Sequence, residues 1–181
     1  MPNSEAQTKP RPNFQTERLL LRRPGAGDIG AVIAIAGDWE VARRLARVPH
    51  PYGERDAHFF LDIIVPSELV WAITWRESAE LVGMVGLTQQ AENDTAELGY
   101  YVDRSHWGIG IATEAATPVV DYGLHVLGLR CLKSGYFLDN PRSGRVLTKL
   151  GFVEIGRADR PCLAAGSTVP SVEMRLEASP P

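Results

Sequence analysis

Runs of apolar residues with two different periodicities alternate along the chain. Three β-rich runs, at 69–76, 81–90 and 95–102, are separated only by short polar turns, which predicts antiparallel strands. One short apolar run and several stretches with helical spacing precede them, and an alternation of helices and strands follows. We therefore expect a mixed α/β (α+β) domain built around one sheet.

N-cap candidates, glycines and prolines predict the bounds of the remaining elements. We expect helices from Asp28 to Gly37, from Asp38 to Arg47, from Glu54 to Val65, at 112–127 and at 140–151, and strands at 18–22, 129–137, 152–158 and 171–177. Pro118 lies inside the fourth helix and predicts a kink or an irregular first turn, because an interior proline costs about 3 kcal/mol. The polar, proline-containing segment 1–14 predicts a disordered tail, which leaves 15–178 as one domain.

Composition argues against several classes of protein. The 181 residues carry 19 basic and 22 acidic side chains, and the net charge of −3 argues against a general nucleic-acid or anionic-membrane binder. No run approaches the roughly 20 apolar residues of a membrane helix, and the N-terminus has no apolar signal core. We therefore expect a cytoplasmic protein with neither a nucleic-acid nor a membrane partner. Cys131 and Cys162 form no ligand or disulfide spacing, and Cys131 is expected in the core.

The segment 104–116 contains the clearest chemical signal. Gly108, Gly110 and Ala112 follow a predicted strand and open a predicted helix, so backbone N–H groups can converge where the helix N-terminus adds partial positive charge. Such a loop suits a phosphate or pyrophosphate, although an isolated Gly-x-Gly is more often a plain turn. No Gly-Lys-Ser/Thr follows, which excludes a Walker-type site. Thr113 stands where a dinucleotide fingerprint needs a third small residue, so dinucleotide binding is not expected.

A second segment strengthens this interpretation. Asn140 fits an N-cap, Pro141 the first helical turn and Gly151 the end of a helix. In chain order the motifs read Glu97-Leu-Gly-Tyr-Tyr-Val, then Trp107-Gly-Ile-Gly-Ile-Ala-Thr-Glu-Ala, then Asn140-x-x-Ser-x-x-Val-x-x-Lys-Leu-Gly-Phe. Together they resemble the GNAT acetyltransferase superfamily and, within it, the ribosomal-protein-alanine N-acetyltransferase (RimJ/RimL-like) branch. The similarity covers about residues 15–178.

The resemblance implies a fold, a co-substrate and a binding site. The GNAT fold is a central, mostly antiparallel mixed sheet, flanked by helices and splayed between its fourth and fifth strands, here 95–102 and 129–137. Acetyl-CoA is the implied co-substrate, with no metal. Its pyrophosphate is expected at the loop amides and its pantetheine arm along the splayed strand, while Arg142 and Arg145 could reach its phosphates. The implied cofactor-binding residues are Tyr100, Tyr101, Val102, Trp107, Gly108, Ile109, Gly110, Ile111, Ala112, Thr113, Asn140, Ser143 and Arg145.

Acetyl transfer to an amine needs a neutral amine and a proton for the departing thiolate. Glu97 points opposite to Leu98 on its strand and resembles the acidic residue that family members use through water; the alternative is a solvated carboxylate. Ser143 corresponds to the serine that RimL-like enzymes are thought to use near the sulfur; the alternative is an ordinary helix-start serine. Leu147 occupies the position where many GNAT enzymes have a tyrosine, which excludes a tyrosine acid there.

The acceptor is not identified by the sequence. In this fold the acceptor groove is shaped by the early helices and by the loop before the last strand, here 37–55, with His50, Tyr52 and Glu54, and 158–170, with Asp159 and Arg160. A ribosomal protein N-terminus, another peptide α-amine, an aminoglycoside and a polyamine all stay open, as does a homodimer. The predicted function is an acetyl-CoA-dependent N-acetyltransferase acting on a primary amine, and the alternative is a non-catalytic acyl-CoA-binding or sensing module.

Overall fold

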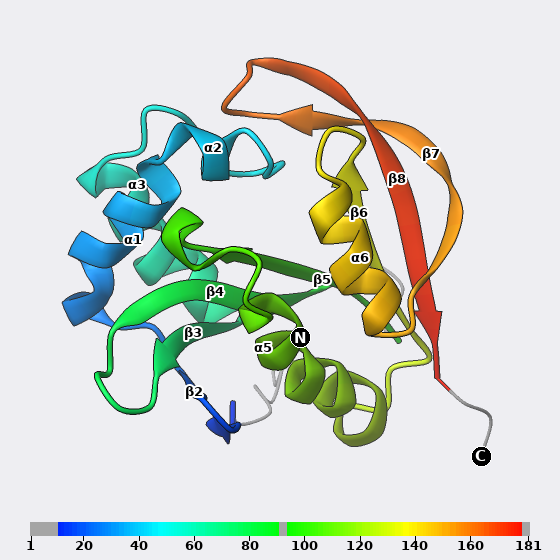
Figure 1. Cartoon of the computed structure of the whole chain (residues 1–181), viewed down its shortest axis with the longest axis horizontal. Helices are drawn as coiled ribbons and strands as arrows, with labels where there is room; N and C mark the ends of the chain where they lie inside the picture. The colour runs from blue at the N-terminus through cyan, green and yellow to red at the C-terminus, as the bar shows by residue number, and fades with distance from the viewer. Residues whose placement is uncertain (1–10, 91–93, 179–181) are drawn as a thin grey trace, which may run out of the picture.

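The structure is a computed structural model that describes residues 11–90 and 94–178. These residues form an eight-stranded sheet with the order β1-β2-β3-β4-β5-β6-β8-β7, which is antiparallel everywhere except between β5 and β6 (Figure 1). The strands are β1 Phe14–Gln15, β2 Leu19–Arg22, β3 Leu69–Trp75, β4 Leu81–Gln89, β5 Thr95–Val102, β6 Cys131–Phe137, β7 Val153–Cys162 and β8 Ser167–Glu177. The predicted mixed, mostly antiparallel sheet is therefore confirmed.

The sheet opens between β5 and β6. These two strands pair only from Thr95 to Glu97, whereas β5 pairs with β4 along its whole length up to Val102. The Ser134 hydroxyl donates a hydrogen bond to the Leu98 carbonyl at 2.9 Å, which marks the point where the strands separate. The splay predicted between the strands at 95–102 and 129–137 is thus found between β5 and β6.

Helices cover both faces of the sheet (Figure 1). One face packs against η1 Ala26–Asp28, α1 Ile29–Gly37, α2 Trp39–Ala42, α3 Glu54–Phe59, the π-helical turn η2 Phe60–Ile64 and α4 Val65–Ser67. The other face packs against α5 Ile111–Asp121, the π-helical turn η4 Tyr122–Val126 and α6 Pro141–Lys149, while η3 Arg104–His106 leads into α5. Within the described residues, no helix is long and apolar enough to cross a membrane.

Alternation along β5 divides the core into two apolar clusters. Leu98 packs with α5 residues such as Ile111 and Val119, and Tyr100 borders the same cluster. Tyr101 instead borders the cluster formed with α1 and α4, around Val32 and Val65. The predicted assignment of alternate β5 side chains to opposite faces is correct. Consequently Glu97 and Tyr101 face one side of the splayed sheet while Tyr100 faces the other.

The packed chain begins earlier than the predicted boundary at residue 15. The Trp71 indole donates a hydrogen bond to the Pro12 carbonyl at 2.7 Å, and the Phe14 ring lies 5.5 Å from that of Trp71. The Arg11 guanidinium binds the carbonyls of Val65 and Glu68 at 2.6 Å. The tail predicted over 1–14 therefore does not include these residues, and its remainder, 1–10, lies outside the described residues.

Two other predictions need correction. The helix predicted from Asp38 to Arg47 ends at Ala42, because the chain then turns to pair with the distant β7–β8 hairpin through a hydrogen bond from Leu163 N–H to the Ala46 carbonyl at 3.1 Å. The loop predicted over 158–170 is instead the outer end of that hairpin, because β7 continues to Cys162 and β8 begins at Ser167. Strand β7 lies at the sheet edge with most residues exposed, so it lacks the apolar alternation that would have revealed its full length.

Candidate functional site

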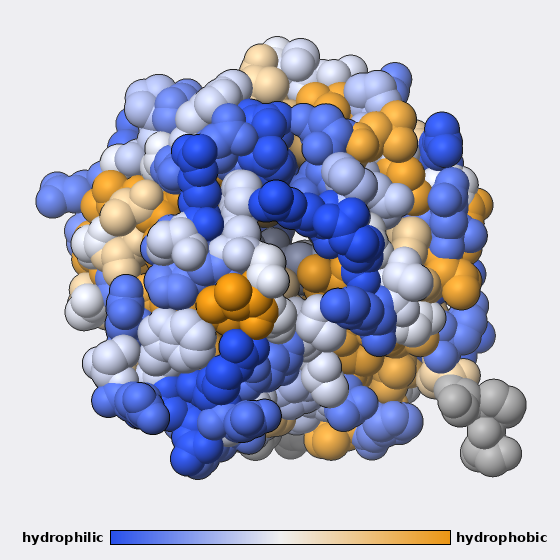
Figure 2. Space-filling view, in the orientation of Figure 1, coloured by the Kyte–Doolittle hydropathy of each residue, from blue (hydrophilic) through white to orange (hydrophobic). Residues whose placement is uncertain are grey.

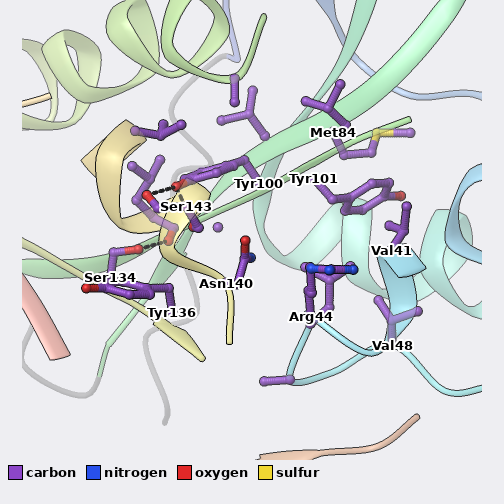
Figure 3. Close-up of a pocket in the computed structure, with 18 of the residues that line it drawn as sticks. Val41, Arg44, Val48, Met84, Tyr100, Tyr101, Ser134, Tyr136, Asn140 and Ser143 are labelled. Atoms are coloured by element: carbon purple, nitrogen blue, oxygen red, sulfur yellow. Dashed lines mark hydrogen bonds between the residues drawn. The ribbon is translucent and has the colours of Figure 1, made fainter. Parts of the chain in front are cut away.

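A cavity of about 1360 Å³ opens at the splay between β5 and β6. Figure 2 shows it as a hollow near the centre of this face, rimmed mostly by hydrophilic side chains. A pocket for one ligand usually measures about 300–1,000 Å³, so this cavity has room for two ligands. We call the part lined by Tyr100, Ser134, Asn140 and Ser143 and by the loop 107–113 the α6 half. We call the part lined by Val41, Leu45, Val48, Phe60, Ile64 and Met84 the α3 half (Figure 3).

The glycine loop lies at the mouth of the α6 half. Gly108 and Gly110 have φ angles of +84° and +89°, values that L side chains rarely adopt. Gly110 is also the residue before α5, so the loop amides and the first turn of that helix lie at one place on the cavity wall. Unpaired N–H groups at a helix N-terminus attract anions. The geometry therefore suits the predicted phosphate or pyrophosphate.

Side chains from the start of the chain support this loop, a feature that the sequence analysis missed. The Arg18 guanidinium donates hydrogen bonds to the Ile109 carbonyl at 3.0 Å and to the Glu114 carboxylate at 2.7 Å. Glu114 also accepts hydrogen bonds from the Thr16 hydroxyl at 2.6 Å and from Arg18 N–H at 2.9 Å. Burial raises the pKa of Glu114, but these hydrogen bonds outweigh it and the pKa is lowered overall. The partners are more than 90 residues apart, so no local motif signals them.

Two hydroxyl groups meet in the α6 half. The Tyr100 hydroxyl lies 2.7 Å from the Ser143 hydroxyl and 3.1 Å from the Ser143 carbonyl (Figure 3). Burial raises the pKa of Tyr100 to about 12, although the hydrogen bond to Ser143 acts in the opposite direction. Among the described residues, the Asn140 side chain caps no N–H group of α6, and it lines the cavity instead. Leu147 is fully buried in the core, so position 147 points away from this site.

Trp107 is fixed at the boundary between the two halves. Its indole N–H donates to the Val102 carbonyl at 2.7 Å, which ties the loop to the end of β5. The Arg44 guanidinium, from the segment after α2, lies 5.1 Å from the indole ring, and that of Arg142, from α6, lies 6.0 Å from it. Cations at these distances are attracted to an aromatic face. The two halves therefore meet at a stacked aromatic group, with Arg145 further along α6 on the cavity wall.

Glu97 faces the other side of the sheet, where Arg160 binds it. The Arg160 Nη1 atom lies 2.5 Å from Glu97, while its Nε and Nη2 atoms each donate to Glu173 at 2.7 Å. The hydrogen bonds from Arg160 lower the pKa of Glu173, and those to Glu173 and Glu97 raise the pKa of Arg160. Gly135 leaves room for this guanidinium, since a Cβ there would lie 3.2 Å from the Arg160 Cζ atom. Glu97 is thus held in an ion-pair network, with its side chain 36% exposed.

The structure brings together most, but not all, of the predicted site residues. The implied cofactor-binding residues line the cavity except for Ile109, whose carbonyl binds Arg18. Of the residues expected to shape the acceptor groove, Tyr52 and Arg160 line it. His50, Glu54 and Asp159 lie outside the set of described residues that line the cavity, and His50 stacks on Trp39 with ring centroids 5.1 Å apart.

Comparison with known proteins settles the family. Residues 18–153 match a family model described as an acetyltransferase (GNAT) domain. This chain belongs to the GNAT acetyltransferase family. An uncharacterized N-acetyltransferase of Bacillus subtilis, YoaA, is 31% identical to this GNAT protein over 150 residues, which cover 80% of this chain and 85% of the relative. The chain is therefore an acyltransferase, as predicted.

Two further matches bear on the branch and the fold. A ribosomal-protein-serine acetyltransferase of Escherichia coli is 33% identical over 75 residues, which cover 41% of this GNAT protein and 40% of the relative, and this supports the predicted RimJ/RimL-like branch. The crystal structure of spermidine N-acetyltransferase from Vibrio cholerae in complex with CoA and spermine superposes with a TM-score of 0.77 at 19% identity. That match covers 90% of this chain and 97% of the other, so it shows a shared fold.

Proposed function

We propose that this GNAT enzyme transfers an acetyl group directly from acetyl-CoA to a primary amine. The observation that carries the proposal is the opening between β5 and β6, with the glycine loop at one end and the paired hydroxyls of Tyr100 and Ser143 inside. An extended thioester can enter such an opening and an amine can approach from the opposite half of the same cavity. The cavity volume of about 1360 Å³ supports two ligands at once.

The residues of the α6 half fit acetyl-CoA. The backbone amides of 107–113 would hold the pyrophosphate, because both glycines keep the loop in its left-handed conformation and Arg18 binds the Ile109 carbonyl. On the side facing β6, the end of β5 is unpaired beyond Glu97, which leaves backbone groups such as those of Tyr100 for the pantetheine arm. The Val102 carbonyl there already accepts the Trp107 indole N–H, and Asn140 faces the same space. Arg145 would add charge near the phosphates. When bound, acetyl-CoA supplies an activated acyl thioester.

Ser143 and Tyr100 would act on the thiol side of the reaction. As the amine nitrogen bonds to the acetyl carbon, the carbon–sulfur bond breaks and the proton lost by nitrogen ends on sulfur. Ser143 would donate a hydrogen bond to the developing thiolate, and Tyr100 would orient the Ser143 hydroxyl at 2.7 Å. With a pKa of about 12, Tyr100 keeps its proton and stays a hydrogen-bond donor at neutral pH.

Glu97 would act on the amine side. Its carboxylate faces the α3 half, where an arriving ammonium must lose a proton before its nitrogen can attack. An alkyl ammonium has a pKa near 10.4 and an α-ammonium one near 8, so a proton acceptor aids either amine at neutral pH. Arg160 would aim this carboxylate, because its guanidinium is itself fixed by two hydrogen bonds to Glu173.

A thiol-release assay with acetyl-CoA and a panel of amines and peptides tests the proposal. We expect saturable release, with kcat lowered about 10²-fold by Glu97→Gln and by Ser143→Ala, the usual size of an acid–base contribution. Ser105→Ala, at an exposed position beside the same loop, is the control and should keep full activity. Thermal stabilisation by acetyl-CoA without release for any acceptor would instead identify a non-catalytic acyl-CoA-binding module.

A further inference from the structure

The α3 half of the cavity is walled by apolar side chains from three parts of the chain. Val41, Leu45 and Val48 come from α2 and the segment after it, Phe60 and Ile64 come from η2, and Met84 comes from β4. Figure 3 shows Val41, Val48 and Met84 gathered around Tyr101, across the cavity from Ser143. All of these apolar side chains except Val48 belong to one apolar cluster, and most are only partly buried by the protein itself. Apolar surface left partly uncovered inside a cavity is suited to an apolar ligand group.

The two tyrosines in this half are neutral hydrogen-bonding groups. Burial, with the charge of the nearby Asp56 as a second cause, raises the pKa of Tyr52 to about 12. Burial likewise raises the pKa of Tyr101, with Tyr52 as a second cause. Both hydroxyls therefore stay protonated at neutral pH. They can orient an uncharged amine nitrogen, but they offer no negative charge to a cation.

The carboxylates that line the cavity, among the described residues, all have partners. Glu68 is paired with Arg47 at 2.7 Å, and Glu97 is paired with Arg160 at 2.5 Å. The remaining two have their partners close to the cavity wall: Asp139 is paired with Arg43 at 2.5 Å, and Asp56 accepts a hydrogen bond from Gly53 N–H at 2.9 Å. An ammonium that displaces an arginine from a carboxylate gains little binding free energy, because it only replaces one positive charge by another.

A cation also stands in the α3 half. The Arg44 guanidinium binds the Glu40 carboxylate at 2.7 Å through one nitrogen and stacks on Trp107, and it projects into the space between Asn140 and Tyr101 (Figure 3). A second ammonium placed among the apolar side chains would therefore meet neutral hydroxyls and a like charge, and the Asp56 carboxylate near Tyr52 already accepts the Gly53 N–H. Desolvating a charge in such surroundings is unfavourable.

We propose that the acceptor of this enzyme is a primary amine attached to an apolar group with no second cation, which excludes polyamines as preferred substrates. This inference rests on the proposed acetyl transfer and adds its substrate class. The same chemistry is offered by a small alkyl or aryl amine and by the N-terminus of a peptide whose first side chain is apolar. The apolar group would fill the α3 half while the nitrogen faces Glu97 and Ser143.

Matched pairs of acceptors test the inference. We expect kcat/KM for hexylamine to exceed that for 1,6-diaminohexane and for spermidine at least tenfold, because the first pair differs only in a second ammonium. Peptides with N-terminal Leu and N-terminal Lys form the second arm, and they separate a protein N-terminus from a small amine. A diamine or spermidine used as well as hexylamine would overturn the substrate class and leave acetyl transfer standing.

A variant inside the α3 half makes the test sharper. Val48 is only partly buried, so Val48→Glu should fold and place an unpaired carboxylate among the apolar walls. We expect it to shift the hexylamine-to-diaminohexane ratio at least tenfold toward the diamine. Glutamine has about the size of glutamate but no charge, so Val48→Gln should not raise use of the diamine. An unchanged ratio in Val48→Glu contradicts the inference.

Calorimetry gives a readout independent of turnover. With the protein saturated by CoA, hexylamine should bind at least tenfold more tightly than 1,6-diaminohexane. If hexylamine binds in this way but no amine is acetylated, the proposed acetyl transfer fails and the substrate-class chemistry of the cavity survives. If neither amine binds measurably and hexylamine is acetylated no faster than the diamine, the inferred substrate class is wrong while acetyl transfer itself stands.

Discussion

In the α6 half of the cavity a ligand would meet backbone amides of 107–113 and a few polar side chains at the ends of β5 and α6. In the α3 half it would meet apolar side chains that come from the segment after α2, from η2 and from β4. The first half depends on glycine dihedral angles and on one helix N-terminus, which a short motif can encode. The second depends on side chains brought together only by the fold. The proposed acetyl-CoA site is thus formed mainly by backbone groups, whereas the proposed acceptor site is formed mainly by side chains.

The largest effect is expected from breaking the glycine geometry of the α6 half. Each non-glycine residue at a left-handed φ costs about 1–2 kcal/mol, so Gly108→Ala combined with Gly110→Ala should weaken acetyl-CoA binding about 30- to 1,000-fold. Calorimetric titration with acetyl-CoA measures this loss. Binding of acceptor amines to the α3 half should change far less.

A matched control exists for that experiment. Gly30, in α1, has open space around its Cβ position and no positive φ, so Gly30→Ala should leave acetyl-CoA affinity unchanged. Circular dichroism spectra should show that all three proteins are folded. Unaltered affinity in the double alanine variant would mean that the loop does not hold the pyrophosphate.

A smaller effect, confined to the α3 half, is expected at Arg160. Arg160→Lys keeps the charge but cannot reproduce three separate nitrogen contacts to Glu97 and Glu173, so the Glu97 carboxylate loses its fixed orientation. We expect kcat/KM for the acceptor to fall about tenfold, equivalent to about 1.4 kcal/mol. The Kd for acetyl-CoA should stay unchanged, and the pH profile of kcat should move. Equal losses in kcat/KM for the acceptor and in affinity for acetyl-CoA would show that Arg160 acts on the whole sheet.

The same contrast explains how much could be predicted from the sequence. The loop 107–113, Asn140 and Ser143 were predicted from residue type at fixed spacing, and apart from Ile109 they line the cavity. The position of Arg160 was noted only as part of a presumed loop, because β7 is an exposed edge strand with little apolar pattern. The pair formed by Tyr100 and Ser143 could not be foreseen, since 43 residues and the splay of the sheet separate them.

Some predictions failed for a physical reason that is common to them. The helix predicted through Arg47 has helical spacing, but hydrogen bonds to the hairpin override local propensity after Ala42. Residues 11–14 looked like a polar tail, yet Phe14 and Arg11 make contacts to Trp71 and to α4 that only the folded sheet provides. Long-range contacts of this kind leave little trace in a local pattern.

A modest pH effect is expected from the side chains that support the glycine loop. Because the folded pKa of Glu114 is lowered, its contribution is fully present above the unfolded value of about 4.3 and is lost as pH falls through the folded pKa. The wild type should therefore lose more stability than Glu114→Gln between about pH 5 and pH 3. Urea unfolding at several pH values measures the difference. Parallel losses in the two proteins would show that the pKa of Glu114 is the same in the folded and unfolded states.

The smallest effect is expected from Arg145, and its salt dependence separates side-chain charge from backbone geometry. Arg145 is exposed on α6 and lines the α6 half, so its attraction to a phosphate is screened by solvent. Arg145→Ala should weaken acetyl-CoA binding about two- to fivefold at low salt, equivalent to at most about 1 kcal/mol. At 1 M salt the Debye length falls to about 3 Å, and the difference should vanish. The loss caused by the double glycine variant should persist there, because dihedral strain does not depend on ionic strength. If 1 M salt abolished both losses of affinity equally, the loop would act mainly through long-range charge. The contribution of backbone geometry could then not be separated from that of side-chain charge.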